Sequence, residues 1–489
     1  MMPLLDLAAV GALLLATVVL GVVGLRISRT TSDFFVASRS VRPVWNASAI
    51  SGEYLSAGTF LGLAGLVLLS GAEGFWFPIG YAAGYLLLLL FVAAPLRRSG
   101  AYTIPDFIQA RLESQGARRV TSLLVLVTGW LYIVPQLHGA SLALGVVADV
   151  PPWTGAVLVA VVVAGIVAAG GMRAITAVQA MQYWLKLTAL ALPAVLILMA
   201  LSGGEPTFDP GVVFPAERGP SGADAYETVS LMIALLLGTI GLPHVLVRFY
   251  TSPDGGSARR TTVLVIAMVG VFYAASGTMG LIARVVAPDL AVPGVADTVV
   301  LELPSRVFPG LVGDLLTALI VAGAFAAFLA TSSGLVVSLA GVVSQDVFDG
   351  SVRSFRVSAV LCTLVPLAFA LFTEPEGLVS SVGTVFVVAA SSLTPVILLG
   401  VWWPGLTARG AVAGMVTGAL SCGAALMATP LARGGAAEAL LAQPAAWTIP
   451  LAAAVVVVVS LLDRRRIPAR TERYLTRLHV PERRADSIG

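Results

Sequence analysis

Long apolar runs cover almost the whole sequence, and their length limits what the chain can fold into. A helix needs roughly 20 apolar residues to cross the hydrocarbon layer of a bilayer. Runs of this length recur from one end of the 489-residue chain to the other, and only 11% of its residues are charged, compared with about 25% in an ordinary soluble domain. The sequence therefore excludes a soluble enzyme and predicts an all-α integral membrane protein.

We predict thirteen membrane-spanning helices from these runs. Asp6 lies where a signal peptide would carry positive charge, and no small-residue cleavage pattern precedes Arg26, so the first run is predicted to be a retained helix. The predicted spans lie near residues 4–25, 44–70, 76–96, 120–147, 153–171, 175–201, 226–249, 261–286, 309–344, 355–373, 377–402, 410–430 and 445–463.

The arginines provide a test of this number of spans, because short cytoplasmic loops carry an excess of positive charge. With the N-terminus outside, thirteen spans put 24 of the 28 arginines on the cytoplasmic side. The four exceptions are Arg218, Arg284, Arg306 and Arg433. We therefore expect an N-terminus outside and a cytoplasmic C-terminus, with the basic tail 464–489 facing solvent or lipid headgroups.

Charge and residue usage exclude several classes of function. A net charge of +3 over this length gives no indication of nucleic-acid binding. The two cysteines, Cys362 and Cys422, lie in apolar runs, and the three histidines have no metal-binding spacing. We find no ATP-binding loop and no clustered catalytic groups, so neither a primary pump nor an enzyme is expected.

The second predicted span is unusually rich in small and polar residues. It reads WNASAISGEYLSAGTFLGLAG from Trp45, and such a stretch favours a break in the helix. Unwound backbone frees carbonyl oxygens, which suit a hard cation such as Na⁺, and helix ends suit a small anion. The alternative is that the small residues only allow close helix packing. The candidate substrate pocket at this break consists of Tyr54, Ser56, Gly58 and Thr59.

The seventh predicted span carries a second interruption, at Gly238, Gly241 and Pro243. Interrupted spans at corresponding places of two halves are typical of transporter binding sites. Spans two to six and seven to eleven then form two five-helix halves, and the second is inverted because five is odd. We divide the chain into a first helix at 1–30, inverted repeats at 31–203 and 204–404, two further helices at 405–463 and a basic cytoplasmic tail at 464–489.

Six strings in order resemble the sodium:solute symporter family. The similarity is to its cation/acetate symporter subgroup, the monocarboxylate transporters, and it extends from about residue 30 to 430. The strings are SGEYLSAGTFLG from Ser51, RRSGAYTIPDF from Arg97, GGMRAITAVQ from Gly170, GLPHVLVRFYTS from Gly241, SQDVF from Ser344 and WWPGLTARGAVAGMVTG from Trp402.

The resemblance implies a leucine-transporter-type core of five plus five helices, with one helix before it and two after. It also implies a sodium site built from two backbone carbonyls of the second span and, from the ninth, a carbonyl and two adjacent hydroxyls. On this sequence these positions are Gly52, Leu55, Ala327, Ala330 and Thr331. Ala330 has no hydroxyl, so one of the five oxygens is absent, although Ser332 or a water could replace it.

Because of this departure, both Na⁺ and H⁺ remain candidates for the coupling ion. Glu53 is the only carboxylate deep within the second span, and Lys186, the only lysine, lies in the middle of the sixth. Either could exchange a proton, and Lys186 could instead bind a substrate carboxylate or pair with a structural acid. Gln136 is a candidate pathway residue, as is His138 more weakly, and His244 near the cytoplasmic mouth is a candidate for gating.

We therefore expect a secondary symporter in a bacterial inner (plasma) membrane that imports acetate or a related small monocarboxylate, such as propionate or pyruvate. No cofactor and no obligate protein partner are expected, and the lipid bilayer is the surrounding partner. The alternatives are a sodium-coupled symporter for another small solute such as an amino acid, a channel, or a substrate-sensing membrane protein. The 26 residues of the tail 464–489 are too few for an appended kinase domain.

Overall fold

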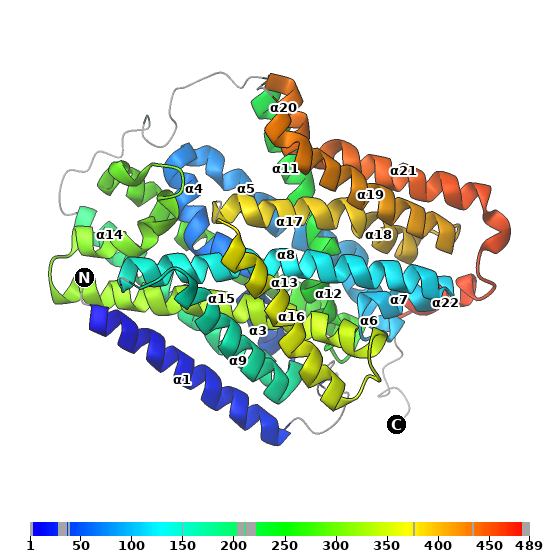
Figure 1. The fold of residues 1–489 in the computed structure, drawn as a ribbon, viewed down its shortest axis with the longest axis horizontal. Coiled ribbons are helices and arrows are strands. Elements are labelled where there is room, and N and C mark those ends of the chain that lie inside the picture. The colour runs from blue at the N-terminus through cyan, green and yellow to red at the C-terminus, as the bar shows by residue number, and fades with distance from the viewer. Residues whose placement is uncertain are drawn as a thin grey trace.

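The structure is a computed structural model, and it describes residues 3–27, 37, 40–148, 150–202, 211, 222–374, 377–432 and 435–481. The described residues form helices and contain no strand, as expected for an all-α membrane protein (Figure 1). The α-helices are α1 Pro3–Ile27, α3 Pro43–Tyr54, α4 Leu63–Ser70, α5 Trp76–Leu87, α6 Ala93–Ser99, α7 Ile104–Leu112, α8 Gln115–Val147, α9 Trp153–Ser202, α11 Gly222–Gly241, α12 Pro243–Phe249, α13 Gly255–Val286, α14 Val299–Val307, α15 Leu311–Asp346, α16 Val352–Phe372, α17 Leu378–Ser392, α18 Thr394–Trp402, α19 Ala408–Ala428, α20 Gly435–Ala442, α21 Ala445–Leu462 and α22 Thr471–His479.

Within these residues, ten helices are long and apolar enough to cross a membrane, or eleven if α17 and α18, bent by 42°, count as one. This number is lower than the thirteen predicted spans because the helical segments Gly58–Ser99 and Trp153–Ser202 each contain two of them. In both segments a glycine with positive φ, Gly71 at 62° and Gly171 at 57°, takes the backbone out of helical geometry without a loop. The predicted span boundaries near 70 and 171 therefore coincide with bends inside continuous helical segments.

Both predicted interruptions are confirmed. Helix α3 ends at Tyr54, Leu55 is extended, and the π-helical turn η2 (Gly58–Gly62) leads into α4. Between α11 and α12, Leu242 is extended. Pro243 begins α12 and cannot donate a backbone hydrogen bond to the preceding turn, so the helix stops there.

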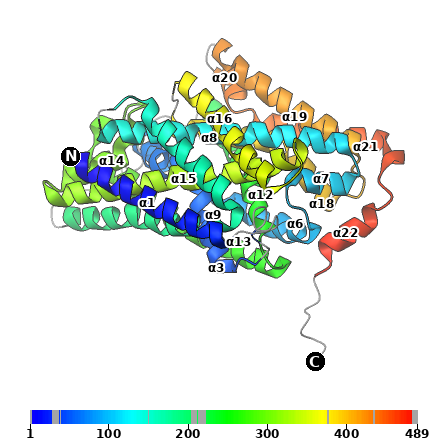
Figure 2. The ribbon, with the colours of Figure 1, turned by 60° about the horizontal axis from the view of Figure 1, so that its bottom comes forward.

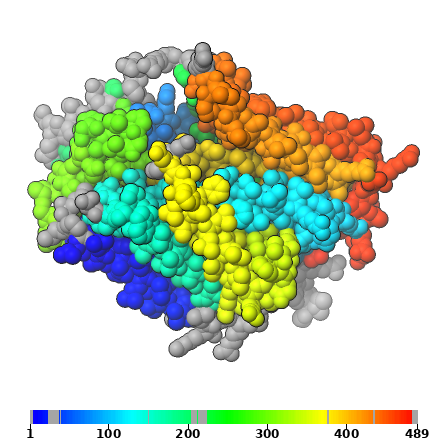
Figure 3. Space-filling view, in the orientation of Figure 1, coloured from blue at the N-terminus to red at the C-terminus, as the bar shows by residue number. Residues whose placement is uncertain are grey.

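Helix α15 lies at the centre of the bundle. It packs against α9, α8, α1, α16 and α3, and nearly all of its residues from Leu316 to Val342 are buried. The space-filling view shows α1, α9, α16 and α8 covering one face of the molecule (Figure 3). The breaks in α3 and α11–α12 lie in the interior, because Leu55, Ser56 and Leu242 are fully buried.

The C-terminal helix α22 docks on one end of the bundle, where it packs against α6, α7 and α18 (Figure 2). The Arg98 guanidinium donates to the Leu478 carbonyl at 3.2 Å, and His479 contacts the Val401 carbonyl at 3.0 Å. In both ribbon views the N-terminus of α1 lies at the opposite end of the bundle from α22. We call the end with α22 the tail end.

Candidate functional site

The break after α3 releases two carbonyl groups from the helix. In an uninterrupted helix, the carbonyls of Gly52 and Leu55 would accept from the amides four residues later. Instead, the Thr59 amide donates to the Ser56 carbonyl at 3.1 Å, and the Ala57 amide donates to the Gln136 side chain at 2.8 Å. The break is therefore capped by a side chain of α8, and its free carbonyls point to other partners.

Lys186 is the partner of the free carbonyls of Gly52 and Leu55. Its Nζ donates to the Leu55 carbonyl at 2.7 Å and also to the Gly52 carbonyl. Lys186 lies on α9 with no exposed surface. Next to it, the Thr331 hydroxyl of α15 donates to the Glu53 carbonyl at 2.6 Å. Three carbonyls around the break thus accept from side chains of two other helices.

A buried ion pair joins the two interrupted helices. Arg248 of α12 lies 2.6 Å from Glu53 of α3, and their side chains are 1% and 2% exposed. The same guanidinium donates to Thr176 at 2.9 Å and to Gln179, both on α9. Gln179 in turn donates to the Ala330 carbonyl of α15 at 2.7 Å. This network connects α3, α9, α12 and α15.

Glycines allow these helices to approach closely. A Cβ on Gly52 would lie 2.2 Å from the Gln179 carbonyl, and one on Gly334 would lie 2.0 Å from the Glu53 side chain. Side chains at these positions would separate α3 from α9 and α15. The glycines therefore hold Glu53 and the break within reach of Gln179 and Lys186.

On another side of the break, several buried polar atoms have no hydrogen-bond partner among the described residues. They are the hydroxyls of Ser56, Tyr81 and Tyr132 and both ring nitrogens of His244. The Tyr132 and His244 rings are 5.2 Å apart, and the Tyr132 hydroxyl lies near those of Ser56 and Tyr81. Phe386 of α17 contacts the rings of Tyr81 and Tyr132, with centroids 4.5 and 6.0 Å away. We call Ser56, Tyr81, Tyr132, His244 and Phe386 the chamber.

The other predicted substrate residues near the break have polar groups that are already hydrogen-bonded within the protein. The Tyr54 hydroxyl contacts Thr239 at 3.1 Å, and Thr59 donates to the Ser56 carbonyl at 3.0 Å. Gly58 packs against the backbone of α17, and Gln136 caps the Ala57 amide. Of the predicted substrate residues, Ser56 alone presents an unpaired side-chain group to the chamber.

Several other predicted residues lie in surroundings that differ from the sequence-based picture. His244 is fully buried among the chamber residues, whereas a position near the cytoplasmic mouth was expected, and Lys186 donates to the carbonyls of Gly52 and Leu55. His138 contacts the Ala370 carbonyl of α16 at 3.2 Å, in a pocket lined by Trp153 and other residues outside the chamber.

Sequence reasoning missed Arg248, Thr176, Gln179 and Tyr132. The sequence did contain a signal for the α9 residues. Thr176, Gln179, Tyr183 and Lys186 recur at helical spacing in an otherwise apolar span and share one face of α9. Polar residues that share one face of a spanning helix indicate an interior contact.

The centre of the molecule has an excess of positive charge. Glu53, Lys186 and Arg248 are all buried. With the amine protonated, they carry two positive charges and one negative charge. A buried excess charge is costly unless a counter-charge approaches it. The chamber beside this network therefore favours an anion.

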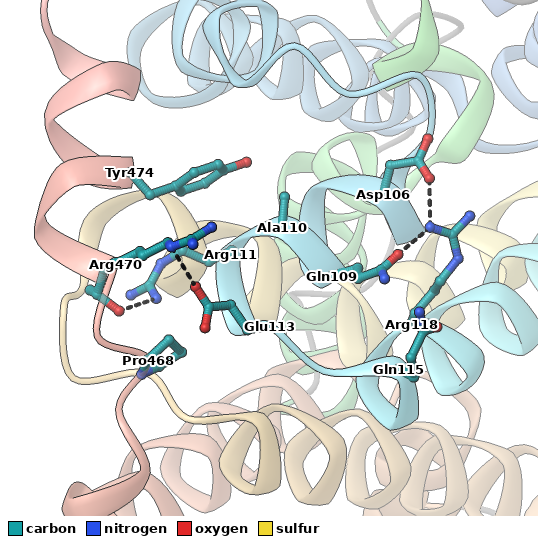
Figure 4. A pocket seen from close by; sticks show the side chains of 11 residues that line it. Asp106, Gln109, Ala110, Arg111, Glu113, Gln115, Arg118, Pro468, Arg470 and Tyr474 are labelled. Atoms are coloured by element: carbon teal, nitrogen blue, oxygen red, sulfur yellow. Dashed lines mark hydrogen bonds and ion pairs between the residues drawn. The ribbon is translucent and has the colours of Figure 1, made fainter.

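A separate pocket at the tail end is lined by side chains that hold α22 in place. Figure 4 shows it between α7, the start of α8 and α22. Its charged groups are already paired, because Arg118 bonds Asp106 at 2.8 Å and Arg111 donates to the Gly400 and Trp403 carbonyls at 3.0 and 2.9 Å. None of the chamber residues lines it. Its side chains hold α22 against the bundle.

Most of the chain is similar to known membrane transporters. The family model described as sodium:solute symporter family matches residues 34–418. The monocarboxylic acid transporter of Corynebacterium glutamicum is 31% identical, with 87% of this chain and 84% of that protein covered. The uncharacterized symporter YwcA of Bacillus subtilis is 32% identical, with 81% and 80% covered.

Solved structures show the fold. A Na⁺-coupled sialic acid symporter in a substrate-bound outward-open state aligns with a TM-score of 0.73 at 17% identity, covering 94% of this chain and 98% of that one. MhsT in complex with L-phenylalanine aligns at 0.55 and 13% identity, covering 86% and 98%. Mhp1, a nucleobase-cation-symport-1 family transporter, aligns at 0.54 and 13% identity, covering 91% and 98%. The chain therefore has the leucine-transporter-type fold.

Proposed function

Because the chain belongs to the sodium:solute symporter family, a family of multi-pass membrane transporters, we propose that it imports acetate or a related small monocarboxylate such as propionate or pyruvate. The co-substrate is a cation, Na⁺ or H⁺. The monocarboxylic acid transporter of C. glutamicum, at 31% identity, supports this class of substrate.

The chamber is the observation that carries the proposal. Its buried hydroxyls and imidazole nitrogens have no partner among the described residues, and leaving such groups unpaired costs about 1–3 kcal/mol each. A carboxylate has two oxygens that accept from several donors at once. The hydroxyls of Ser56 and Tyr132 and the ring of His244 form the proposed binding site.

Charge favours a simple acid over an amino acid. The Lys186 ammonium and the Arg248 guanidinium share one carboxylate, that of Glu53. A monocarboxylate would neutralise the excess positive charge, whereas the ammonium group of an amino acid would add a further cation to the same buried region. The aromatic rings of Phe386 and Tyr81, with centroids 4.5 Å apart, supply the apolar contacts that suit a short alkyl chain.

In the proposed cycle, the repeats at 31–203 and 204–404 rock against each other around the two breaks. The Glu53–Arg248 pair joins α3 to α12 and so holds the two repeats in one register. The chamber residues are fully buried, so in this conformation they are closed off from both sides of the membrane. Opening toward either side separates the repeats and exposes the carboxylate to that solution.

We also propose that the chain lies in a bacterial plasma membrane with its N-terminus outside and its C-terminus in the cytoplasm. The arginine distribution supports this orientation. The positions of the N-terminus and α22 at opposite ends of the bundle support an odd number of crossings.

Uptake into proteoliposomes tests the proposal. The measurement is the initial rate of entry of labelled acetate, with pyruvate and propionate as competitors, under an imposed Na⁺ or pH gradient at fixed membrane potential. Protein-free liposomes are the control, because undissociated acetic acid crosses lipid unaided. We expect saturable uptake that both competitors inhibit. Uptake equal to that of protein-free liposomes under every gradient would contradict the proposal, and non-saturable flux would indicate a channel.

A further inference from the structure

The family's sodium site, carried onto this sequence, does not fit the structure. Two of its five oxygens, the carbonyls of Gly52 and Leu55, accept from the Lys186 ammonium. A third is absent, because position 330 is alanine. The Thr331 hydroxyl donates its proton to the Glu53 carbonyl at 2.6 Å, and its oxygen keeps lone pairs that can accept a cation. Thr331 and the Ala327 carbonyl are therefore the two of the five positions that remain.

An ammonium group and a sodium ion cannot use these oxygens together. The Lys186 Nζ lies 2.7 Å from the Leu55 carbonyl oxygen, a usual length for a charge-assisted hydrogen bond, about 2.7–2.9 Å. A Na⁺ ion between the same two carbonyls would have to lie at the position of Nζ. Both groups carry one positive charge, so the second would be repelled as well as sterically excluded.

Lys186 has partners that offset part of the cost of burying an ammonium here. Its carbonyl partners supply the negative ends of two backbone dipoles, and the Glu53 carboxylate on α3 attracts its charge. Arg248 of α12 lies beyond Glu53 and bonds to the Glu53 carboxylate. On α9 itself, the Tyr183 hydroxyl is directed to the Met268 carbonyl of α13, at 3.0 Å.

We propose that the ε-ammonium of Lys186 takes the place of the sodium ion, so that this chain does not bind Na⁺ at the break in α3. The lysine orders the break in every step of the cycle, because it is covalently attached to α9. Its consequence for transport rests on the proposed function. Carboxylate uptake is then expected to be independent of Na⁺, which leaves H⁺ as the candidate coupling ion.

The structure also indicates how the sodium site can be restored. Removing the lysine side chain frees the carbonyls of Gly52 and Leu55. A serine at position 330 supplies the absent hydroxyl beside Thr331, and the Ser332 hydroxyl, buried without a partner among the described residues, is its near neighbour. The double variant Lys186→Ala/Ala330→Ser therefore has the complete set of oxygens that the resemblance implies.

Sodium binding to the purified protein tests the proposal without any transport. Thermal unfolding in detergent is followed as NaCl replaces choline chloride at constant ionic strength, and ²²Na⁺ binding is measured in parallel. We expect no sodium-specific shift in the wild type. The double variant is expected to show a saturable, sodium-specific rise in Tm and matching ²²Na⁺ binding.

Two further variants keep the test decisive. Gln182→Ala removes a buried polar side chain one turn away on α9 that contacts Thr17 of α1, and it is expected to show no sodium response. Lys186→Met preserves side-chain volume if the alanine variants fail to fold, and combined with Ala330→Ser it is expected to gain a weaker sodium response. A saturable sodium response in the wild type, or none in a folded double variant, would overturn the proposal.

Uptake measurements separate this inference from the proposed function. Wild-type uptake of acetate that needs sodium would overturn the inference and leave the symporter function intact. Absence of uptake under every gradient would contradict the function, while the sodium-binding result would still decide the role of Lys186. In the double variant, uptake is expected to change from sodium-independent to sodium-dependent.

Discussion

The two sides of the break in α3 differ in how their polar groups are satisfied. On the side of α9 and α15, Lys186, Thr331 and Arg248 bond the carbonyls of the break and the Glu53 carboxylate. On the side of the chamber, Ser56, Tyr132 and His244 have no partner among the described residues. Satisfied buried groups stabilise one conformation, whereas unpaired ones favour a ligand. We infer that the first side is a fixed support and the second binds the substrate.

The largest effect is expected from breaking the buried ion pair on the satisfied side. Arg248→Met leaves the Glu53 carboxylate buried without its partner, which costs about 3–5 kcal/mol. Thermal unfolding in detergent is expected to show a large loss of stability. The double variant Glu53→Gln/Arg248→Met removes the stranded charge and is expected to recover part of that loss. Loss of stability in the double variant equal to the sum of the two single losses would mean that the pair is not coupled.

The next effect concerns the ammonium at the break. Lys186→Met leaves the carbonyls of Gly52 and Leu55 without their donor, at about 1–3 kcal/mol for an unsatisfied buried group. Acetate uptake is expected to fall by about tenfold or more, because each 1.4 kcal/mol corresponds to a factor of ten. The matched control is Gln182→Met, on the same helix, with uptake close to wild type. Unchanged uptake by Lys186→Met would assign the lysine no role in the cycle.

Substitutions in the chamber are expected to change affinity and stability in opposite directions. Tyr132→Phe and Ser56→Ala each remove a donor to the substrate, worth about 1.5–3 kcal/mol when the acceptor is charged, so the half-saturating acetate concentration should rise about tenfold or more. Stability without substrate should stay the same or rise, because an unpaired buried hydroxyl is removed. Tyr183→Phe, which lies outside the chamber, serves as the control for affinity. A loss of stability with unchanged affinity would make these residues part of the fixed support.

The smallest loss of stability is expected from breaking the solvent-exposed ion pair between Arg306 and Asp289, which, like the buried pair, joins an arginine to a carboxylate. The Arg306 guanidinium holds the pKa of Asp289 below its usual value, chiefly by a direct hydrogen bond. A carboxylate whose pKa is lower in the folded state than in the unfolded state stabilises the fold at pH values above the unfolded-state pKa. This stabilisation is lost as the pH falls through the folded-state pKa. Because the pair is exposed, Asp289→Asn should leave Tm at neutral pH nearly unchanged. A loss comparable to that of Arg248→Met would show that burial does not set the difference between the two pairs.

Much of the architecture could be predicted from the sequence because it depends on local patterns. Apolar run lengths predict the all-helical membrane fold, and Pro243 and the small residues around Gly52 predict the two breaks. The sequence predicts thirteen spans, and the structure joins two pairs of them into continuous helical segments, because the bends at Gly71 and Gly171 need no loop residues. A glycine with positive φ is not distinguishable in the sequence from one that allows close packing.

The contacts of the site were harder to predict from the sequence, because they join distant parts of the chain. Glu53 and Arg248 are 195 positions apart, and Lys186 is 131 positions from Leu55. The sequence indicates that each is buried, but only packing brings them together. Lys186 and the carbonyls of Gly52 and Leu55 were assigned separate roles for this reason. The chamber hydroxyl of Tyr132 lies in an apolar stretch of α8 with no local signal of function.

Acetate uptake into proteoliposomes in sodium-free medium with an imposed inward proton gradient, corrected for protein-free liposomes, tests the role of Lys186 most directly. We expect saturable uptake that pyruvate and propionate inhibit, at a rate that added Na⁺ does not increase. Uptake that occurs only when a sodium gradient is present would contradict the assignment of Lys186 as the cation at the break in α3.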